Sequence, residues 1–163
     1  MWVDRLQIGE LKNVAFYLLP GLIFGLVVAL SLWRRGLAGR RSAALFVAAS
    51  IIAWPAAYYA GGSLLLAIDA KGLLRLALAG FAGGLVWAVI PAAAAMAFPF
   101  MRARRVWPVL IIAGGVTGAL CVSLLETLGH WGFGAIYIVL WGVWYAVFSG
   151  VLATALPSEG VGE

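Results

Sequence analysis

Five long apolar stretches, each separated from the next by a short polar or charged segment, constrain this chain more than any other feature. A helix needs about 20 apolar residues to cross the hydrocarbon core of a bilayer. The stretches cover about 14–33, 43–62, 73–101, 106–128 and 131–156, and all are long enough. The stretch at 73–101 is longer than required, which predicts a tilt or a kink at Pro91. The sequence therefore predicts an all-α polytopic membrane protein, a bundle of about five transmembrane helices spanning 14–156.

The amino-acid composition excludes an ordinary soluble domain. Hydrophobic residues make up 65% of the 163 residues and charged residues 10%, against about 45–50% and 25% in soluble proteins. A chain this small exposes much of its side-chain surface, so a bilayer suits it better than water. Residues 1–13 mix charged and apolar side chains, which predicts an interfacial segment. The polar tail at 157–163 is predicted to be disordered.

The distribution of basic residues predicts the orientation. With five crossings, the loops after the first and third stretches share a side with the C-terminus. Those loops carry Arg34, Arg35, Arg40, Arg41, Arg102, Arg104 and Arg105, and the other side carries Arg5, Lys12, Lys71 and Arg75. Because cytoplasmic loops are enriched in Lys and Arg, we expect a cell (inner) membrane protein with its N-terminus outside and its C-terminus in the cytoplasm.

The same arginines suggest a partner. Guanidinium groups bind phosphate bidentately, so anionic lipid headgroups on the cytoplasmic side are candidate ligands. A purely topogenic role alone also explains the arginines. The net charge of +5 is accounted for at the membrane face, and no nucleic-acid partner is expected.

Small residues recur at the spacing that lets membrane helices approach closely. Lipid is as apolar as leucine, so helices associate through packing rather than expulsion from water. Glycine pairs four residues apart occur at Gly21 and Gly25, Gly80 and Gly84, and Gly114 and Gly118, and Gly142 lies on a small-residue face of the last stretch. We expect these faces to pack within the chain; seams between copies in a homo-oligomer, or with another membrane protein, are the alternative.

A row of rings lies on another face of the last stretch, about 130° from its small face at 100° per residue. It consists of Phe133, Tyr137, Trp141, Trp144 and Phe148. Two interpretations remain open. The rings either fill the core or face lipid, or they line a hydrophobic pocket for a lipid or small molecule.

Few ionisable residues are candidates for chemistry. Glu126 and His130 are four residues apart and share a helix face if the helix continues that far. They form either an acid–base pair or an interfacial polar loop. Asp69 is expected on the same outer side, where the three side chains would line a vestibule. Local pairing of Asp69 with Lys71 and Arg75 is the alternative.

These residues leave three classes of function open. A single cysteine and a single histidine give no disulfide or cysteine metal site, no nucleotide-binding or hydrolase signature is present, and no metal or cofactor is expected. The leading hypothesis is a non-enzymatic accessory subunit, assembly partner or lipid or small-molecule binder. A small oligomeric transporter or channel using the vestibule is the alternative. A lipid-modifying enzyme using Glu126 and His130 is the third.

Overall fold

The computed structural model describes residues 11–69, 71–98, 107–127, 142–151 and 153, with the side chains of 11–16 and 125–127 outside that description. It contains the long helices α1 (Leu11–Arg34), α2 (Arg40–Ala67), α3 (Gly72–Ala95) and α5 (Trp107–Thr127), and the shorter helical segment Gly142–Val151. Each long helix contains an apolar span of at least 18 residues. The predicted fold class, an all-α multi-pass membrane bundle, is confirmed.

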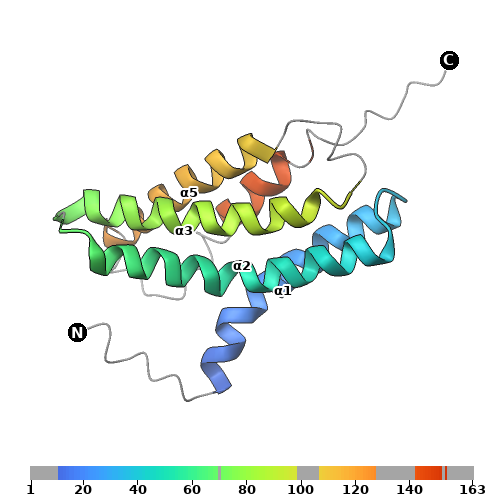
Figure 1. The fold of residues 1–163 in the computed structure, drawn as a ribbon, viewed down its shortest axis with the longest axis horizontal. Coiled ribbons are helices and arrows are strands. Elements are labelled where there is room, and N and C mark those ends of the chain that lie inside the picture. The colour runs from blue at the N-terminus through green and yellow to red at the C-terminus, as the bar shows by residue number, and fades with distance from the viewer. Residues whose placement is uncertain (1–10, 70, 99–106, 128–141, 152, 154–163) are drawn as a thin grey trace.

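The long helices pack in chain order, so that α1 contacts α2, α2 contacts α3, and α3 contacts α5 (Figure 1). Because the chain reverses direction at each step, the α1–α2 turn, the end of α3 and the start of α5 lie at one end of the bundle. The α2–α3 turn lies at the other end, together with the end of α5. The segment Gly142–Val151 packs against this array through Trp144 and Phe148, which contact Trp87 of α3.

Two helices have boundaries that differ from the predicted ones. Helix α2 continues through Gly61 and Gly62 to Ala67, beyond the apolar stretch at 43–62, because Gly61 packs against α3 and does not break the helix. Helix α3 ends at Ala95 and not at 101. The amides of Ala97 and Phe98 turn back to the carbonyls of Ala94 and Ala95, and Phe98 is fully buried. Proline follows at 99, and the residue before a proline disfavours the helical conformation.

The ends of the chain are covered only in part. Helix α1 includes residues 11–13 of the predicted interfacial segment 1–13. Residues 1–10 and the predicted tail 157–163 lie outside the described part, as do 131–141 of the last predicted helix.

The α3–α5 interface is a close backbone contact between two glycine pairs. A Cβ added to Gly84 would collide with the carbonyl oxygen of Gly114, and one added to Gly80 would collide with that of Gly118. The pairing of 80 with 118 and 84 with 114 shows that the helices are antiparallel. Only glycine, which lacks a Cβ, permits this approach, and the α-carbons and carbonyls of the two helices meet directly.

The other two interfaces are also built on small residues. At the α1–α2 interface, a Cβ on Gly25 would lie 2.9 Å from the α-carbon of Val47, and one on Gly21 would meet the carbonyl oxygen of Ser50. At the α2–α3 interface, a Cβ on Gly61 would lie 2.9 Å from the carbonyl oxygen of Ala79, and one on Gly83 equally close to that of Ala57. Gly61 and Gly83 were missing from the set of packing glycines predicted from the sequence.

Gly142 behaves differently from the other six predicted packing glycines. Within the described residues, no atom lies within 4 Å of a Cβ added to Gly142. Ala146 and Ser149 on the same face are exposed as well. The prediction that this small face packs within the chain is therefore not met by any described neighbour. The opposite, aromatic face makes the contacts, because its rings fill the space between α1 and α3.

Helix α1 bends partway along its length, and Figure 1 shows its N-terminal part turning away from the other helices. Pro20 lies inside the helix. A proline removes one helical hydrogen bond, and its ring clashes with the carbonyl four residues earlier, which kinks a helix. A residue distant in the sequence bonds to the bend: the hydroxyl of Tyr145 donates to the carbonyl oxygen of Pro20 at 2.7 Å. We call the part of α1 before Pro20, residues 11–19, the arm.

Candidate functional site

The interior of the bundle is occupied by an aromatic cluster, which we define as Phe24, Phe46, Trp87, Trp144, Tyr145 and Phe148. Phe24 is its hub, and its ring centroid lies 4.8 Å from that of Tyr145 in a stacked arrangement and 5.4 Å from that of Trp87. Trp87 and Trp144 meet edge to face at 4.2 Å. Edge-to-face and offset stacked pairs are favourable geometries for aromatic rings. The cluster joins α1, α2, α3 and the segment Gly142–Val151.

Two of the five residues predicted as a pocket face belong to this cluster. Phe148 is 2% exposed, and Trp144 is partly buried against Trp87. These two rings therefore fill the core, while Phe133, Tyr137 and Trp141 lie outside the described residues. Between α5 and the segment Gly142–Val151, the surface lined in part by Leu110, Ala113 and Val147 leaves essentially no enclosed space for a water-sized molecule. A drug-sized ligand requires a cleft of about 300–1,000 Å³.

Arg75, at the α2–α3 end of the bundle, has a structural role. Its Nε donates to the carbonyl oxygen of Leu65 in the last turn of α2 at 2.7 Å. The last four carbonyls of a helix have no intrahelical donor, and a cation there also complements the helix dipole. Arg75 thus joins α3 to the end of α2. Asp69 and Lys71 lie in the turn between these helices with their side chains exposed.

The backbone register places Glu126 near the same turn. Gly118 of α5 lies opposite Gly80 of α3, and because the helices are antiparallel, a further eight residues bring Glu126 level with Gly72 at the start of α3. Asp69 and Glu126 therefore belong to the same end of the bundle. The side chain of Glu126 and all of His130 lie outside the described residues, so the predicted pairing of Glu126 with His130 stays a prediction.

The opposite end carries Arg34, Arg35, Arg40 and Arg41 on the α1–α2 turn, and we call it the arginine end. All four arginine side chains are exposed. The turn is closed by backbone bonds from the amide of Gly36 to the Trp33 carbonyl and from that of Leu37 to the Leu32 carbonyl, both at 2.9 Å. This is a Schellman motif, and Gly36 adopts the φ of +70° that the motif requires. The loop with Arg102, Arg104 and Arg105 lies outside the described residues, but Phe98 and Trp107, which flank it, belong to this end.

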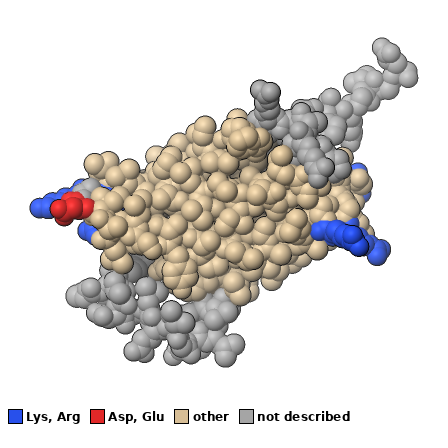
Figure 2. All heavy atoms as spheres, in the orientation of Figure 1, with Lys and Arg blue, Asp and Glu red and all other residues tan. Residues whose placement is uncertain are grey.

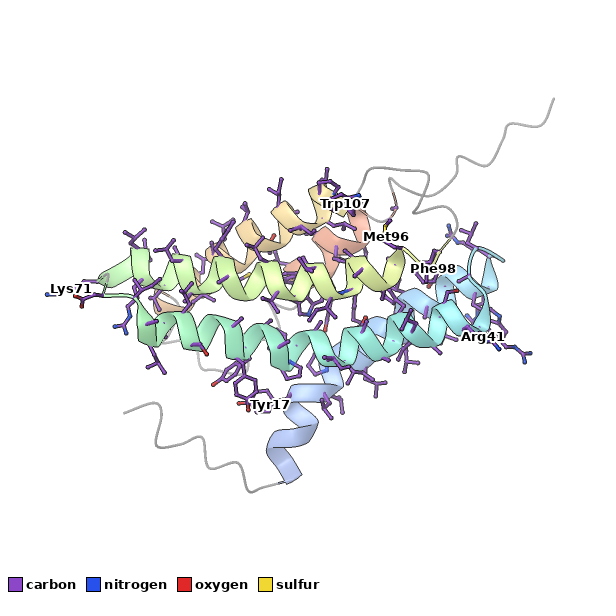
Figure 3. The ribbon with its side chains drawn as sticks, in the orientation of Figure 1. Tyr17, Arg41, Lys71, Met96, Phe98 and Trp107 are labelled. Carbon is purple, nitrogen blue, oxygen red and sulfur yellow. The ribbon has the colours of Figure 1, made fainter. Side chains whose placement is uncertain are left out.

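The charged side chains are confined to the two ends of the described structure. Figure 2 shows Lys and Arg at both ends and Asp or Glu at one, with uncharged residues covering the face between them. Figure 3 shows Lys71 and Arg41 pointing outward at opposite ends. An uncharged belt between two charged rims matches the hydrocarbon core and the two headgroup regions of a bilayer.

Within the described part of the chain, no three His, Cys, Asp or Glu side chains gather where they could hold a metal ion. Sequence reasoning also missed three contributors: Phe24 at the hub of the cluster, the Tyr145–Pro20 hydrogen bond, and Arg75 as a helix cap. A proline within an apolar stretch was the one available signal, since it marks α1 as a bent helix. No protein-family model matches the sequence, and the searches of curated proteins and of solved structures find no significant match.

Proposed function

We propose that this protein is a non-enzymatic membrane component, an accessory subunit that packs against a neighbouring membrane protein. The observation that carries the proposal is the arm of α1, which leaves its own bundle (Figure 1). The rest of α1 packs on α2 through Gly21 and Gly25. Leu18 and Leu19 of the arm are exposed, and a helical arm that bends away from the other helices is available to a second protein.

The angle between the arm and α2 contains aromatic side chains suited to an interface. Tyr17 of the arm, labelled in Figure 3, contacts Tyr58 of α2 edge to face, with the two ring centroids 5.2 Å apart. Tyr58 in turn contacts Tyr59, which is 62% exposed. Tyrosine combines a large apolar ring with a hydroxyl that forms hydrogen bonds, and it is enriched at protein interfaces.

The bend also creates a need for a polar neighbour. Pro20 has no N–H, so the carbonyl of Phe16 loses its usual intrahelical donor. A carbonyl without a donor costs several kcal/mol in hydrocarbon, where no water replaces the lost bond. A side-chain donor from a partner helix would satisfy this carbonyl and lower the cost of the bend.

Site-specific photo-crosslinking tests the accessory role. A benzoyl-phenylalanine introduced at Leu19 in the native membrane is expected to form a discrete adduct with a different protein. The matched control is Ile112 on the outer face of α5, which is also well exposed, at 62%, and is expected to give no such adduct. Adducts from Leu19 only with a second copy of this chain, or equal adducts from Leu19 and Ile112, would contradict the proposal.

For the orientation we propose a cell (inner) membrane with the arginine end in the cytoplasm. Support comes from the four exposed arginines of the α1–α2 turn and from the enrichment of basic residues in cytoplasmic loops. A cysteine introduced at Gly39, which is exposed, has an extended backbone with φ of −77° and has room for a Cβ, with Ser42 Oγ at 3.8 Å, should be labelled by an impermeant maleimide only after the cells are opened.

A further inference from the structure

The α1–α2 turn holds its arginines on a fixed backbone. The Schellman motif fixes the end of α1, and Ala38 in the middle of the turn is 6% exposed and belongs to the core. Ser42 then donates to the carbonyl oxygen of Gly39 at 2.9 Å at the start of α2. Two arginines before the turn and two after it are therefore held close together in space and not on a loose loop.

The charge of this turn is unbalanced within the described structure. Among the side chains that the structure describes, the acidic one is that of Asp69, and it belongs to the opposite end. Arg40 and Arg41 lie in the first turn of α2, where the helix dipole is positive and disfavours cations. Its N-cap residue is Gly39, which makes no side-chain capping bond. An anion bound here would balance the positive charge of the turn and would also interact favourably with the positive end of the α2 dipole.

The two ends of the bundle differ in what their cations do. At the opposite end, Arg75 is occupied by the carbonyl of Leu65, and the nearby Asp69 partly offsets Lys71. At the arginine end, Trp33 is 47% exposed and lies at the charged rim, because Arg34 and Arg35 directly follow it and Arg40 and Arg41 come after the turn. Tryptophan at such a rim lies at headgroup depth, so the arginines lie where lipid phosphates are.

We propose that the α1–α2 turn binds the phosphate groups of anionic phospholipids through Arg34, Arg35, Arg40 and Arg41. Clusters of basic residues beside a transmembrane helix attract anionic lipids, and a guanidinium fork matches two phosphate oxygens at once. This surface is separate from the arm, and lipid binding here does not depend on the accessory role. Phosphate binding differs from a purely topogenic role, because a topogenic role requires only positive charge and not the bidentate geometry of the guanidinium group.

Lipid binding to the purified full-length protein in neutral detergent tests the proposal. Native mass spectrometry would measure the affinity for phosphatidylglycerol, for zwitterionic phosphatidylcholine and for soluble glycerol phosphate. Wild type is expected to prefer phosphatidylglycerol to both others. Removing one basic residue near a membrane surface costs about fivefold in affinity, so the Arg40→Ala/Arg41→Ala variant should bind phosphatidylglycerol roughly 25-fold more weakly. Lys71→Ala, which removes a cation at the opposite end, should change the affinity less than about twofold.

The Arg40→Lys/Arg41→Lys variant separates phosphate recognition from charge alone. It keeps the charge, and with it the topogenic signal, but loses the bidentate fork, so its affinity should fall measurably below that of wild type. Circular dichroism and a single gel-filtration peak would show that each variant is folded. Equal binding of phosphatidylcholine and phosphatidylglycerol, displacement by glycerol phosphate at equal concentration, or wild-type affinity in the lysine variant would overturn the proposal.

Discussion

The α3–α5 interface and the contact surface of the segment Gly142–Val151 achieve close packing by opposite means. Between α3 and α5, Gly80 and Gly84 meet Gly118 and Gly114, and backbone atoms touch directly. The segment Gly142–Val151 instead uses its largest side chains, and Phe148 and Tyr145 contact the ring of Phe24 at 5.2 Å and 4.8 Å. Its small residues are exposed.

The difference teaches that a small-residue face permits close approach without requiring it. In lipid, the gain on association comes from packing, and either backbone contact or interlocking rings supplies it. Gly84 and Gly142 both lie on small-residue faces of long apolar stretches. Only Gly84 has a neighbouring helix within reach among the described residues.

The same substitution in the two regions should therefore have very different effects. Gly84→Leu places a side chain where the carbonyl of Gly114 already lies, and the helices must separate. Overpacking costs about 1–3 kcal/mol, and we expect the upper part of that range or more because backbone cannot move aside. The unfolding midpoint in a titration of mixed micelles with SDS, followed by tryptophan fluorescence, measures the effect.

Gly142→Leu is the matched control for Gly84→Leu. No described atom lies near its added Cβ, and exposed substitutions usually change stability by less than about 0.5 kcal/mol. A loss as large as that of Gly84→Leu would mean that the small face of the last segment is a packing surface after all, and the contrast between the two regions would fail.

Two adjacent glycines of α2 sharpen the comparison within one helix. A Cβ on Gly61 would lie 2.9 Å from the backbone oxygen of Ala79, while one on Gly62 has no described atom within 4 Å. Both Gly→Ala changes raise helix propensity by the same amount, up to about 1 kcal/mol. Gly61→Ala should therefore be less stable than Gly62→Ala by about 1–3 kcal/mol in the same SDS titration. Equal stabilities would contradict the close α2–α3 contact.

The sequence predicted the membrane bundle because hydrophobic length and composition are properties of each stretch by itself. Contacts such as Gly61 with Ala79 depend on the rotation of two helices relative to each other, which no single stretch determines. For this reason neither the contact of Gly61 with α3 nor the continuation of α2 to Ala67 follows from the sequence. Likewise, helix periodicity separated the aromatic from the small face of the last stretch, but only the positions of Phe24 and Trp87 decide which face is buried.

For the candidate sites, the sequence predicts which charged side chains are exposed better than it predicts which groups they bond to. The arginines of the α1–α2 turn are exposed, as charged residues at the end of an apolar stretch must be. Arg75 has a similar sequence context, yet it caps α2 through Leu65, ten residues away. That bond requires the α2–α3 turn to bring the two residues together, and charge counting along the chain cannot reveal it.

The smallest predicted effect concerns the hydrogen bond from Tyr145 to the Pro20 carbonyl, which joins the aromatic surface to the bend of α1. Tyr145→Phe removes the bond to the Pro20 carbonyl but leaves the ring stacked on Phe24. Hydrogen bonds between membrane helices contribute about 0.6 kcal/mol on average, so the SDS midpoint should shift only slightly. Tyr145→Leu also removes the stacked ring, which contributes about 0.5–1.5 kcal/mol beyond its contact area, and should shift the midpoint further. If Tyr145→Phe lowered the SDS midpoint as much as Tyr145→Leu, the hydroxyl and not the ring would make the main contribution of Tyr145 to stability. The packing of this surface would then depend on the hydrogen bond to Pro20 more than on the contacts between rings.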